Sequence, residues 1–262
     1  MSPAQRTRRI ARLFVVGATS IALTTLATTS ASAAGTVVGR WPMNESSGSV
    51  MADTSGSYLA GAIGSAVQLG GGDQGYLFPG WTGNVDASGH LSGKVPATAG
   101  AVSVPDGADV LDPRTGDISV SIVLQATLTA SGRLPTASGA SYNIVQKARA
   151  NDPGGFWKLE LAGSGSTIGK LRWVLSDGTD KVVVTSKPRV DDGAWHTVVA
   201  ERRGNQMVIT VDGTSVSKSA ATIGDIHPTG TWSGTMTVGK KPGSTDPKDA
   251  FAGRLRQLVV SR

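Results

Sequence analysis

The feature that most constrains the fold is a two-residue alternation of apolar and polar side chains that recurs along the chain. Alternation of this kind places the apolar side chains on one face of an extended strand, whereas an amphipathic helix needs a spacing of about 3.6 residues. The clearest examples lie at 118–124, 156–161, 170–175 and 207–211. We therefore predict half-buried β-strands at these positions and almost no helix.

Turn residues separate these strands. Asp-Gly pairs, which tolerate the positive backbone angles of tight hairpin turns, begin at 106, 177, 192 and 212. Many short strands at regular spacing favour an all-β antiparallel sandwich or barrel. Residues 34–262 contain no linker or internal repeat, so we expect one large domain. Residues 70–100 form the one irregular stretch, which is too long for a plain connection.

The first 33 residues have the pattern of a secretory signal peptide: four arginines, an apolar segment and the small-residue site Ala31-Ser32-Ala33. Their removal lowers the net charge from +6 to +2, because they contain four basic residues and no acidic one. We therefore expect a secreted, extracellular protein that does not bind nucleic acid. We also expect no membrane span and a monomer, and the absence of cysteine excludes a disulfide framework.

Five segments carry a family resemblance, and the most specific is "DDGAWHTVVAERRGNQMVITVDG" at 191–213. The other four are "GRWPMNESSGSVMADTSG", "DPRTGDISVSIVLQA", "NIVQKARANDPGGFWKLEL" and "FAGRLRQLVV", in that order along the chain. Together they resemble laminin G-like domains of secreted proteins from actinomycete-like bacteria. The resemblance implies a two-sheet antiparallel β-sandwich, the concanavalin A-like jelly roll, over 34–262 with an insertion at about 70–100. It also implies a module that binds glycans or other extracellular ligands.

One position departs from this family. Many relatives have an acidic residue in the closing strand, and that residue often belongs to a structural calcium site with oxygens of an early loop. Here the equivalent position is Arg256, and a guanidinium does not ligate Ca²⁺. Asp53 in the early loop therefore loses its expected partner, which argues against a calcium-stabilised adhesion or structural protein.

Catalytic motifs were sought because the same fold also hosts enzymes that cleave glycans. The chain has three glutamates, and none has the E-x-D-x-E spacing of glucanase-type hydrolases. The motifs of alginate lyases, serine hydrolases and zinc peptidases are also missing. The remaining enzyme alternative is a hydrolase or lyase with a non-standard site built on Glu160, His196 or His227. We favour a scaffold role for His196, which follows Trp195 in a predicted strand.

Aromatic residues divide into two groups. Four tryptophans occupy inward-compatible strand positions and are predicted to belong to the core: Trp41, Trp157, Trp173 and Trp195. Four aromatic residues lie in loops or at strand ends: Tyr76, Phe78, Trp81 and Trp232. Their rings could either stack on a sugar or pack within the loop, and the sequence favours neither role.

Charged side chains gather on one predicted sheet surface if the strands at 156–161 and 170–175 pair as a hairpin. Lys158 and Glu160 would then lie beside Lys170 and Arg172, opposite the tryptophans. This cluster could recognise an acidic glycan, or it could be a solvated face. The preferred function is a secreted, non-catalytic module whose partner is an extracellular glycan or surface protein. Its candidate binding residues are Tyr76, Trp81, Lys158, Glu160, Arg172, His227 and Trp232.

Overall fold

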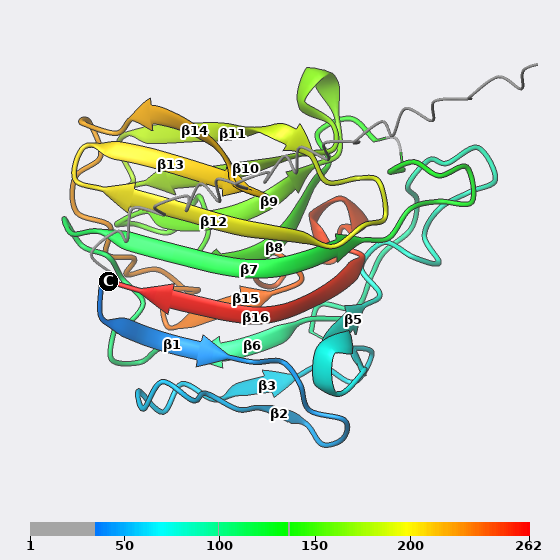
Figure 1. Ribbon diagram of the computed structural model, residues 1–262, viewed down its shortest axis with the longest axis horizontal. Coiled ribbons are helices and arrows are strands. Elements are labelled where there is room, and N and C mark those ends of the chain that lie inside the picture. The colour runs from blue at the N-terminus through cyan, green and yellow to red at the C-terminus, as the bar shows by residue number, and fades with distance from the viewer. Residues whose placement is uncertain (1–34, 99, 136) are drawn as a thin grey trace, which may run out of the picture. The chain divides into compact units, whose positions relative to one another are not determined.

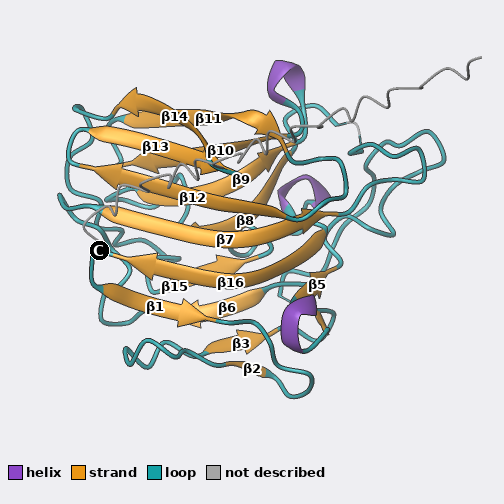
Figure 2. Cartoon of the chain, viewed as in Figure 1, coloured by secondary structure: helices purple, strands orange, loops and turns teal. Residues whose placement is uncertain are grey.

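The computed structural model describes residues 35–98, 100–135 and 137–262 (Figure 1). The predicted signal peptide lies outside the described residues. Regular structure is almost entirely β-strand (Figure 2), which confirms the all-β prediction. The described chain contains three short 3-10 helices, η1 (Gly72–Gln74), η2 (Gly165–Thr167) and η3 (Pro247–Asp249). It contains no helix that is both long enough and apolar enough to cross a membrane.

Two antiparallel sheets form the sandwich. Sheet A contains eight strands in the described part of the chain, in the order β14-β13-β12-β7-β16-β5-β4, with β1 also paired to β16. Its strands are β1 (Val37–Trp41), β4 (Gln68–Leu69), β5 (Tyr76–Phe78), β7 (Ile118–Ala126), β12 (His196–Arg203), β13 (Gln206–Val211), β14 (Thr214–Ser219) and β16 (Gly253–Ser261).

Sheet B lies behind sheet A in the view of Figure 1. It also has eight described strands, in the order β11-β10-β9-β8-β15-β6-β3-β2. They are β2 (Val50–Met51), β3 (Gly61–Ile63), β6 (Val102–Pro105), β8 (Ser141–Lys147), β9 (Phe156–Ala162), β10 (Lys170–Ser176), β11 (Lys181–Arg189) and β15 (Thr235–Val238).

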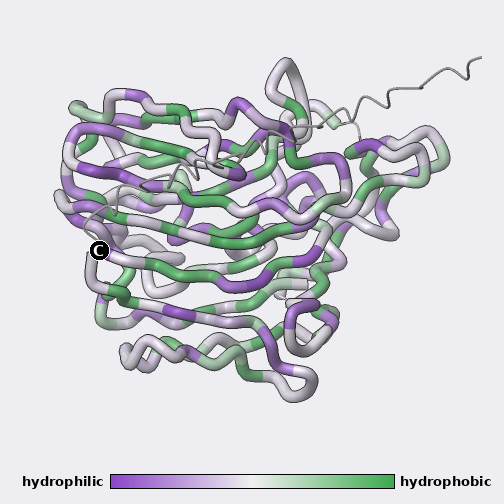
Figure 3. The backbone as a smooth tube through the Cα atoms, viewed as in Figure 1, coloured by the Kyte–Doolittle hydropathy of each residue, from purple (hydrophilic) through white to green (hydrophobic). Residues whose placement is uncertain are grey.

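The core fills the space between the sheets. Strand β7 shows the physical basis most clearly, because its burial alternates at every residue from Ile118 to Ala126. Figure 3 shows the same alternation of hydrophobic and hydrophilic residues along the strands of both sheets. Each fully buried large aliphatic or aromatic side chain stabilises the fold by about 1.5–3 kcal/mol. The period-two pattern of the sequence is therefore the source of the two-layer architecture.

The predicted strands all form, with ends that differ by one or two residues from those expected. The predicted hairpin of β9 and β10 is antiparallel and places Glu160 opposite Arg172. The segment 191–213 forms β12, a turn at Gly204 and β13, as its sequence indicates.

The four Asp-Gly pairs differ in role. Asp212-Gly213, with both φ angles positive, makes a two-residue hairpin turn between β13 and β14, and Asp177-Gly178 joins β10 to β11. The other two pairs lie where the chain leaves sheet B for sheet A, at 106–107 and 192–193, so they do not join neighbouring paired strands.

Three of the four predicted core tryptophans are fully buried, at Trp41, Trp157 and Trp173. The rings of Trp157 and Trp173 pack with their centroids 5.9 Å apart. The prediction was wrong for Trp195, which is half-buried on the outer face of sheet A. There the guanidinium of Arg256 lies 4.5 Å from its ring centre. Trp195 directly precedes β12, and its inward-facing neighbour is His196, so the alternation turns the indole outward.

The aromatic residues of segment 70–100 are also buried. Tyr76 and Phe78 lie on β5, with no exposed surface, and Trp81 is 3% exposed and packs against Tyr142. The interpretation of Tyr76 and Trp81 as ligand-contacting residues is therefore corrected: their rings fill the end of the core. The rest of the segment is held by Lys240, whose buried ammonium donates to the main-chain oxygen of Pro96.

Candidate functional site

A β-bulge in β16 interrupts the regular ladder of sheet A. Arg256 pairs with Val123 of β7, but the next pair along the strand is Val259 with Ser121, so β16 holds one extra residue there. Gln257 adopts the left-handed backbone conformation, with a φ of 55°, and its N–H donates to the main-chain oxygen of Pro42. Bulges redirect side chains and are frequent beside functional sites.

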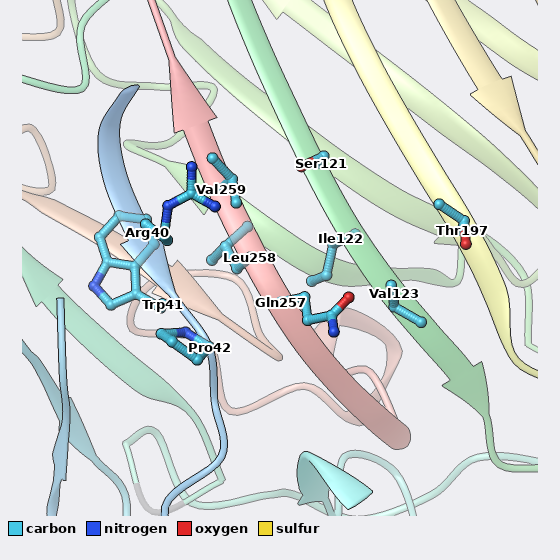
Figure 4. Close-up of a pocket in the computed structure, with 10 residues that line it drawn as sticks. All are labelled: Arg40, Trp41, Pro42, Ser121, Ile122, Val123, Thr197, Gln257, Leu258 and Val259. Carbon is cyan, nitrogen blue, oxygen red and sulfur yellow. The ribbon is translucent and has the colours of Figure 1, made fainter. Parts of the chain in front are cut away.

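A pocket of about 350 Å³ opens over this bulge on the outer face of sheet A. Figure 4 shows its lining side chains on four strands, with Arg40 on β1, Gln257 on β16, Ser121 on β7 and Thr197 on β12. Three further lining residues, Trp41, Ile122 and Leu258, direct their side chains into the core. They therefore contribute main chain to the floor. The pocket thus combines one cation, two hydroxyls, an amide and main chain with the apolar side chains of Pro42, Val123 and Val259.

Strand register extends this surface toward Trp195. Arg256, Val123 and Thr197 occupy one row across β16, β7 and β12. Trp195 stacks on Arg256, so its indole borders the same row. The guanidinium of Arg256 also donates to the main-chain oxygen of Asp73, at 2.6 Å. This outer face therefore carries an aromatic ring, stacked on Arg256, beside the pocket.

Arg40 differs from the arginines around it. Its main-chain N–H donates to Asp53 and its main-chain oxygen accepts from Thr54 N–H, so its backbone is held. Its exposed guanidinium has no ion pair or hydrogen bond with any described residue. A guanidinium offers five donors in a planar fork. Arg40 is therefore available to a ligand, whereas Arg256 is already engaged.

Three of the four charged residues predicted to gather on the other sheet contact one another, whereas Lys170 has no ion pair among the described residues. On the outer face of sheet B, Glu160 lies 2.5 Å from the ammonium of Lys158 and 2.7 Å from the guanidinium of Arg172. It also accepts a short hydrogen bond from Ser141. The carboxylate is only 3% exposed, and both cations are mostly buried. The two cations therefore share one carboxylate, and the three residues together keep one positive charge.

Asp53 has a structural role in this protein. Its two carboxylate oxygens accept from the main-chain N–H groups of Arg40, Ser55 and Leu59 and from the Ser55 hydroxyl. Partial burial acts to raise the pKa of Asp53, but these hydrogen bonds outweigh it and lower the pKa overall. The carboxylate proposed as a doubtful calcium ligand thus organises the loop 52–60.

His196 is held between two carboxylates. Its Nδ1 lies 2.6 Å from Asp212 and its Nε2 lies 2.9 Å from Asp192. Burial acts to lower the pKa of His196, but the hydrogen bonds with Asp212 and Asp192 outweigh it and raise the pKa overall. The histidine therefore links two Asp-Gly segments, at 192–193 and 212–213. This geometry agrees with the scaffold role that the sequence favours.

His227 belongs to a separate cluster at the loop 106–117. Its Nδ1 lies 3.0 Å from Asp112 and 3.9 Å from Asp109. These three residues could supply metal ligands. Beneath them, the buried ammonium of Lys147 lies 2.6 Å from Asp106 and 3.3 Å from Asp112. Burial raises the pKa of Asp112 although Lys147 opposes the shift. Lys147 thus supplies the positive charge that the buried carboxylates need.

The remaining candidate, Trp232, is half-buried in the loop before β15. Arg149 lies over its ring at 5.8 Å, and a side chain at Gly243 would collide with the indole. The predicted site residues therefore occupy separate places, and only Lys158, Glu160 and Arg172 contact one another. Arg40 and Gln257 were not among the binding residues predicted from the sequence, since no sequence signal marks a bulge at a non-glycine residue.

Family comparison identifies one match. Residues 96–262 match the family model Laminin_G_3, described as the concanavalin A-like lectin/glucanases superfamily. The resemblance read from the sequence begins earlier, at residue 39, so the first strands lie outside this match. No curated protein matches the sequence.

Solved structures with the same fold include two toxin domains. The binding domain of Paraclostridial Mosquitocidal Protein 1 has a TM-score of 0.60 and 13% identity, and the match covers 86% of this chain and 48% of that one. The Botulinum Neurotoxin serotype G binding domain has a TM-score of 0.60 and 12% identity, with the same two shares. This chain therefore spans about half the length of either neighbour, and at these identities the likeness concerns the fold.

Proposed function

The chain belongs to the concanavalin A-like lectin/glucanases superfamily, and from this premise we propose that it is an extracellular, non-catalytic module that binds carbohydrate. The fold-level neighbours are themselves binding domains, which supports a binding role. Secretion is part of the proposal and rests on the signal-peptide pattern of residues 1–33.

The observation that carries the proposal is the bulge pocket, defined by Arg40, Ser121, Thr197 and Gln257. Sugars present many hydroxyl groups, and these need both donors and acceptors at close spacing. The pocket supplies a guanidinium, two hydroxyls and an amide, which together offer both. The half-buried ring of Trp195 lies beside the pocket and adds the kind of flat apolar surface on which a sugar ring can stack.

The candidate residues predicted from the sequence have less to offer a ligand. On sheet B, the carboxylate of Glu160 is almost fully buried and already has three partners. Tyr76 and Trp81 are buried in the core. The candidate catalytic residues Glu160, His196 and His227 each have a separate set of partners, and none of the contacts described above joins two of them.

A binding experiment tests the proposal. The protein is run through native gels that contain a neutral β-glucan, a mannan, polygalacturonate or no polysaccharide, and retardation is measured against an inert protein. We expect retardation by at least one polysaccharide, reduced in Arg40→Ala and Gln257→Ala but not in Lys158→Ala on sheet B. Equal mobility in all gels would contradict carbohydrate binding, and retardation lost only in Lys158→Ala would move the site to sheet B.

A further inference from the structure

We propose that Tyr58 is a second contact for the ligand, a platform on which a sugar ring stacks outside the bulge pocket. The proposal rests on the proposed function and extends it to longer polysaccharide chains. It starts from exposure: Tyr58 is 94% exposed, and the only other large hydrophobic residue exposed in the described chain is Val50, at 56%. A fully solvated tyrosine ring contributes almost no buried area to the fold.

The backbone of Tyr58 is strained. Its φ is 60°, the left-handed region that glycine adopts freely and that bulky residues rarely adopt. Strained residues persist only where their surroundings hold them, and they gather at ligand-binding sites. A glycine at this position would relieve the strain without loss of any packing. Stability therefore gives no reason for an aromatic residue here.

The loop around Tyr58 is held firmly. On one side, Ser55 is fixed by Asp53 and accepts from the main-chain N–H of Ser57. On the other side, Leu59 N–H donates to Asp53 at 2.9 Å, and Leu59 oxygen accepts from the buried indole of Trp41 at 2.7 Å. The ring thus projects from a loop anchored on both sides. A pre-organised aromatic ring can bind a ligand at little entropic cost.

The same loop is attached to the bulge pocket. Asp53 accepts from the main-chain N–H of Arg40 at 3.0 Å, and Thr54 N–H donates to the Arg40 oxygen at 2.8 Å. Arg40 in turn directs its side chain into the pocket lining (Figure 4). The loop that carries Tyr58 is therefore tied by two hydrogen bonds to the main chain of Arg40, a residue that lines the pocket. A polysaccharide that fills the pocket with one sugar can place a further sugar on this side.

The ligand class follows from the shape of the site. The ring of Tyr58, which is 94% exposed, offers a flat face to a ligand. The C–H face of a pyranose ring matches such a surface, whereas a hydrophobic peptide anchor needs a pocket that encloses it. The structure thus favours a sugar ring over a protein side chain as the partner of Tyr58.

Three variants test the proposal in the gel assay with the polysaccharide that retards the wild-type protein. Tyr58→Ala should weaken binding by about 3- to 10-fold, while Tyr58→Phe, which keeps the ring, should stay within about twofold of the wild type. Tyr58→Gly should weaken binding while its melting temperature is maintained or raised, because glycine relieves the strain. Val50→Ala, at the other exposed hydrophobic residue of the same hairpin, is the matched control and should bind normally.

The length of the ligand sharpens the test. The loss in Tyr58→Ala should appear with long oligosaccharides and vanish with a monosaccharide, which fills only the pocket. If Tyr58→Ala binds every ligand as the wild type does while Arg40→Ala loses binding, the proposal that Tyr58 contacts the ligand is wrong and the proposed function stands. If no polysaccharide retards the wild type, both fail. If the Tyr58 effect is seen only with a protease-sensitive component of a cell-wall extract, the sugar assignment is overturned.

Discussion

The outer faces of the two sheets carry similar polar residues and use them differently. On sheet B, Lys158 and Arg172 share the buried carboxylate of Glu160, at 2.5 and 2.7 Å. On sheet A, the guanidinium of Arg40 is exposed beside a pocket and has no partner among the described residues. The comparison teaches that the number of charges on a face does not decide its role. The cations paired with the buried Glu160 stabilise the fold, whereas the unpaired, exposed guanidinium of Arg40 is available to a ligand.

The largest effect, a loss of stability, should come from removing the carboxylate that Lys158 and Arg172 share on sheet B. Glu160→Gln leaves two mostly buried cations without their carboxylate, which should destabilise the fold by about 2–3 kcal/mol. Thermal unfolding measures the loss. The control Asp73→Asn changes a carboxylate on a residue that is almost fully exposed and should stay within about 0.5 kcal/mol of the wild type. Equal stability of Glu160→Gln and the wild type would show that the network is not structural.

The next effect separates the two faces by function. Arg40→Ala should reduce polysaccharide affinity by about tenfold, because a charge-assisted hydrogen bond is lost, and leave the melting temperature unchanged. Arg172→Ala should do the reverse, with a lower melting temperature and normal affinity. Affinity electrophoresis and thermal unfolding on the same samples compare both. The opposite pattern would exchange the roles that we assign to the two sheets.

A smaller effect should follow from the bulge itself. Gln257 has a φ of 55°, so Gln257→Gly should keep or raise stability by up to about 1 kcal/mol, whereas Gln257→Val should lose about 1–2 kcal/mol. Both variants remove the amide and should weaken binding. Denaturant unfolding distinguishes them. If valine is tolerated as well as glycine, the backbone at the bulge is not held in the left-handed conformation.

The smallest effect is the pH dependence that His196 adds in sheet A. The pKa of His196 is raised above its ordinary 6.5, so its stabilising contribution is complete below that value and is lost as pH rises through the folded-state pKa. The pKa of Asp192 is lowered by the main-chain N–H of Ala194 and by His196, against burial. At Asp212 burial acts to raise the pKa, but His196 and the main-chain N–H of Thr197 outweigh it and lower the pKa overall. Their contribution is therefore lost as pH falls through those values.

Melting temperatures across pH 4 to 9 check this expectation. The wild type should lose stability on the alkaline side of the His196 pKa, and His196→Gln should flatten that limb of the curve. Glu160→Gln is the comparison on sheet B and should shift the whole curve down without changing its slope between pH 6 and 8. An alkaline limb that persists in His196→Gln would assign it to another group.

Much of the fold could be predicted from the sequence, because the side chains that a strand buries follow from the local spacing of its apolar residues. Ile118 to Ala126 alternates in the sequence and in the structure, and the pairing of 156–161 with 170–175 followed from two such patterns. The cluster of Lys158, Glu160 and Arg172 was predicted for the same reason, since paired strands bring residues of one parity to one face. Tyr76, Trp81 and Trp195 were misread because an aromatic residue near a strand end has no local signal for its direction.

The fold class, the positions of the main strands and the lack of known glycan-cleaving motifs could all be inferred from the sequence, because each depends on residue types at short spacing. The tertiary structure was needed to learn which charged side chains have ion-pair partners, where β16 bulges and which aromatic rings are exposed. Glu160 and Arg40 differ in the partners that other strands bring to them, and Tyr58 differs from Tyr76 in what the fold packs against it. The packing of Tyr76 and the pairing of β16 with β7 join segments far apart in the chain, so no local pattern contains them.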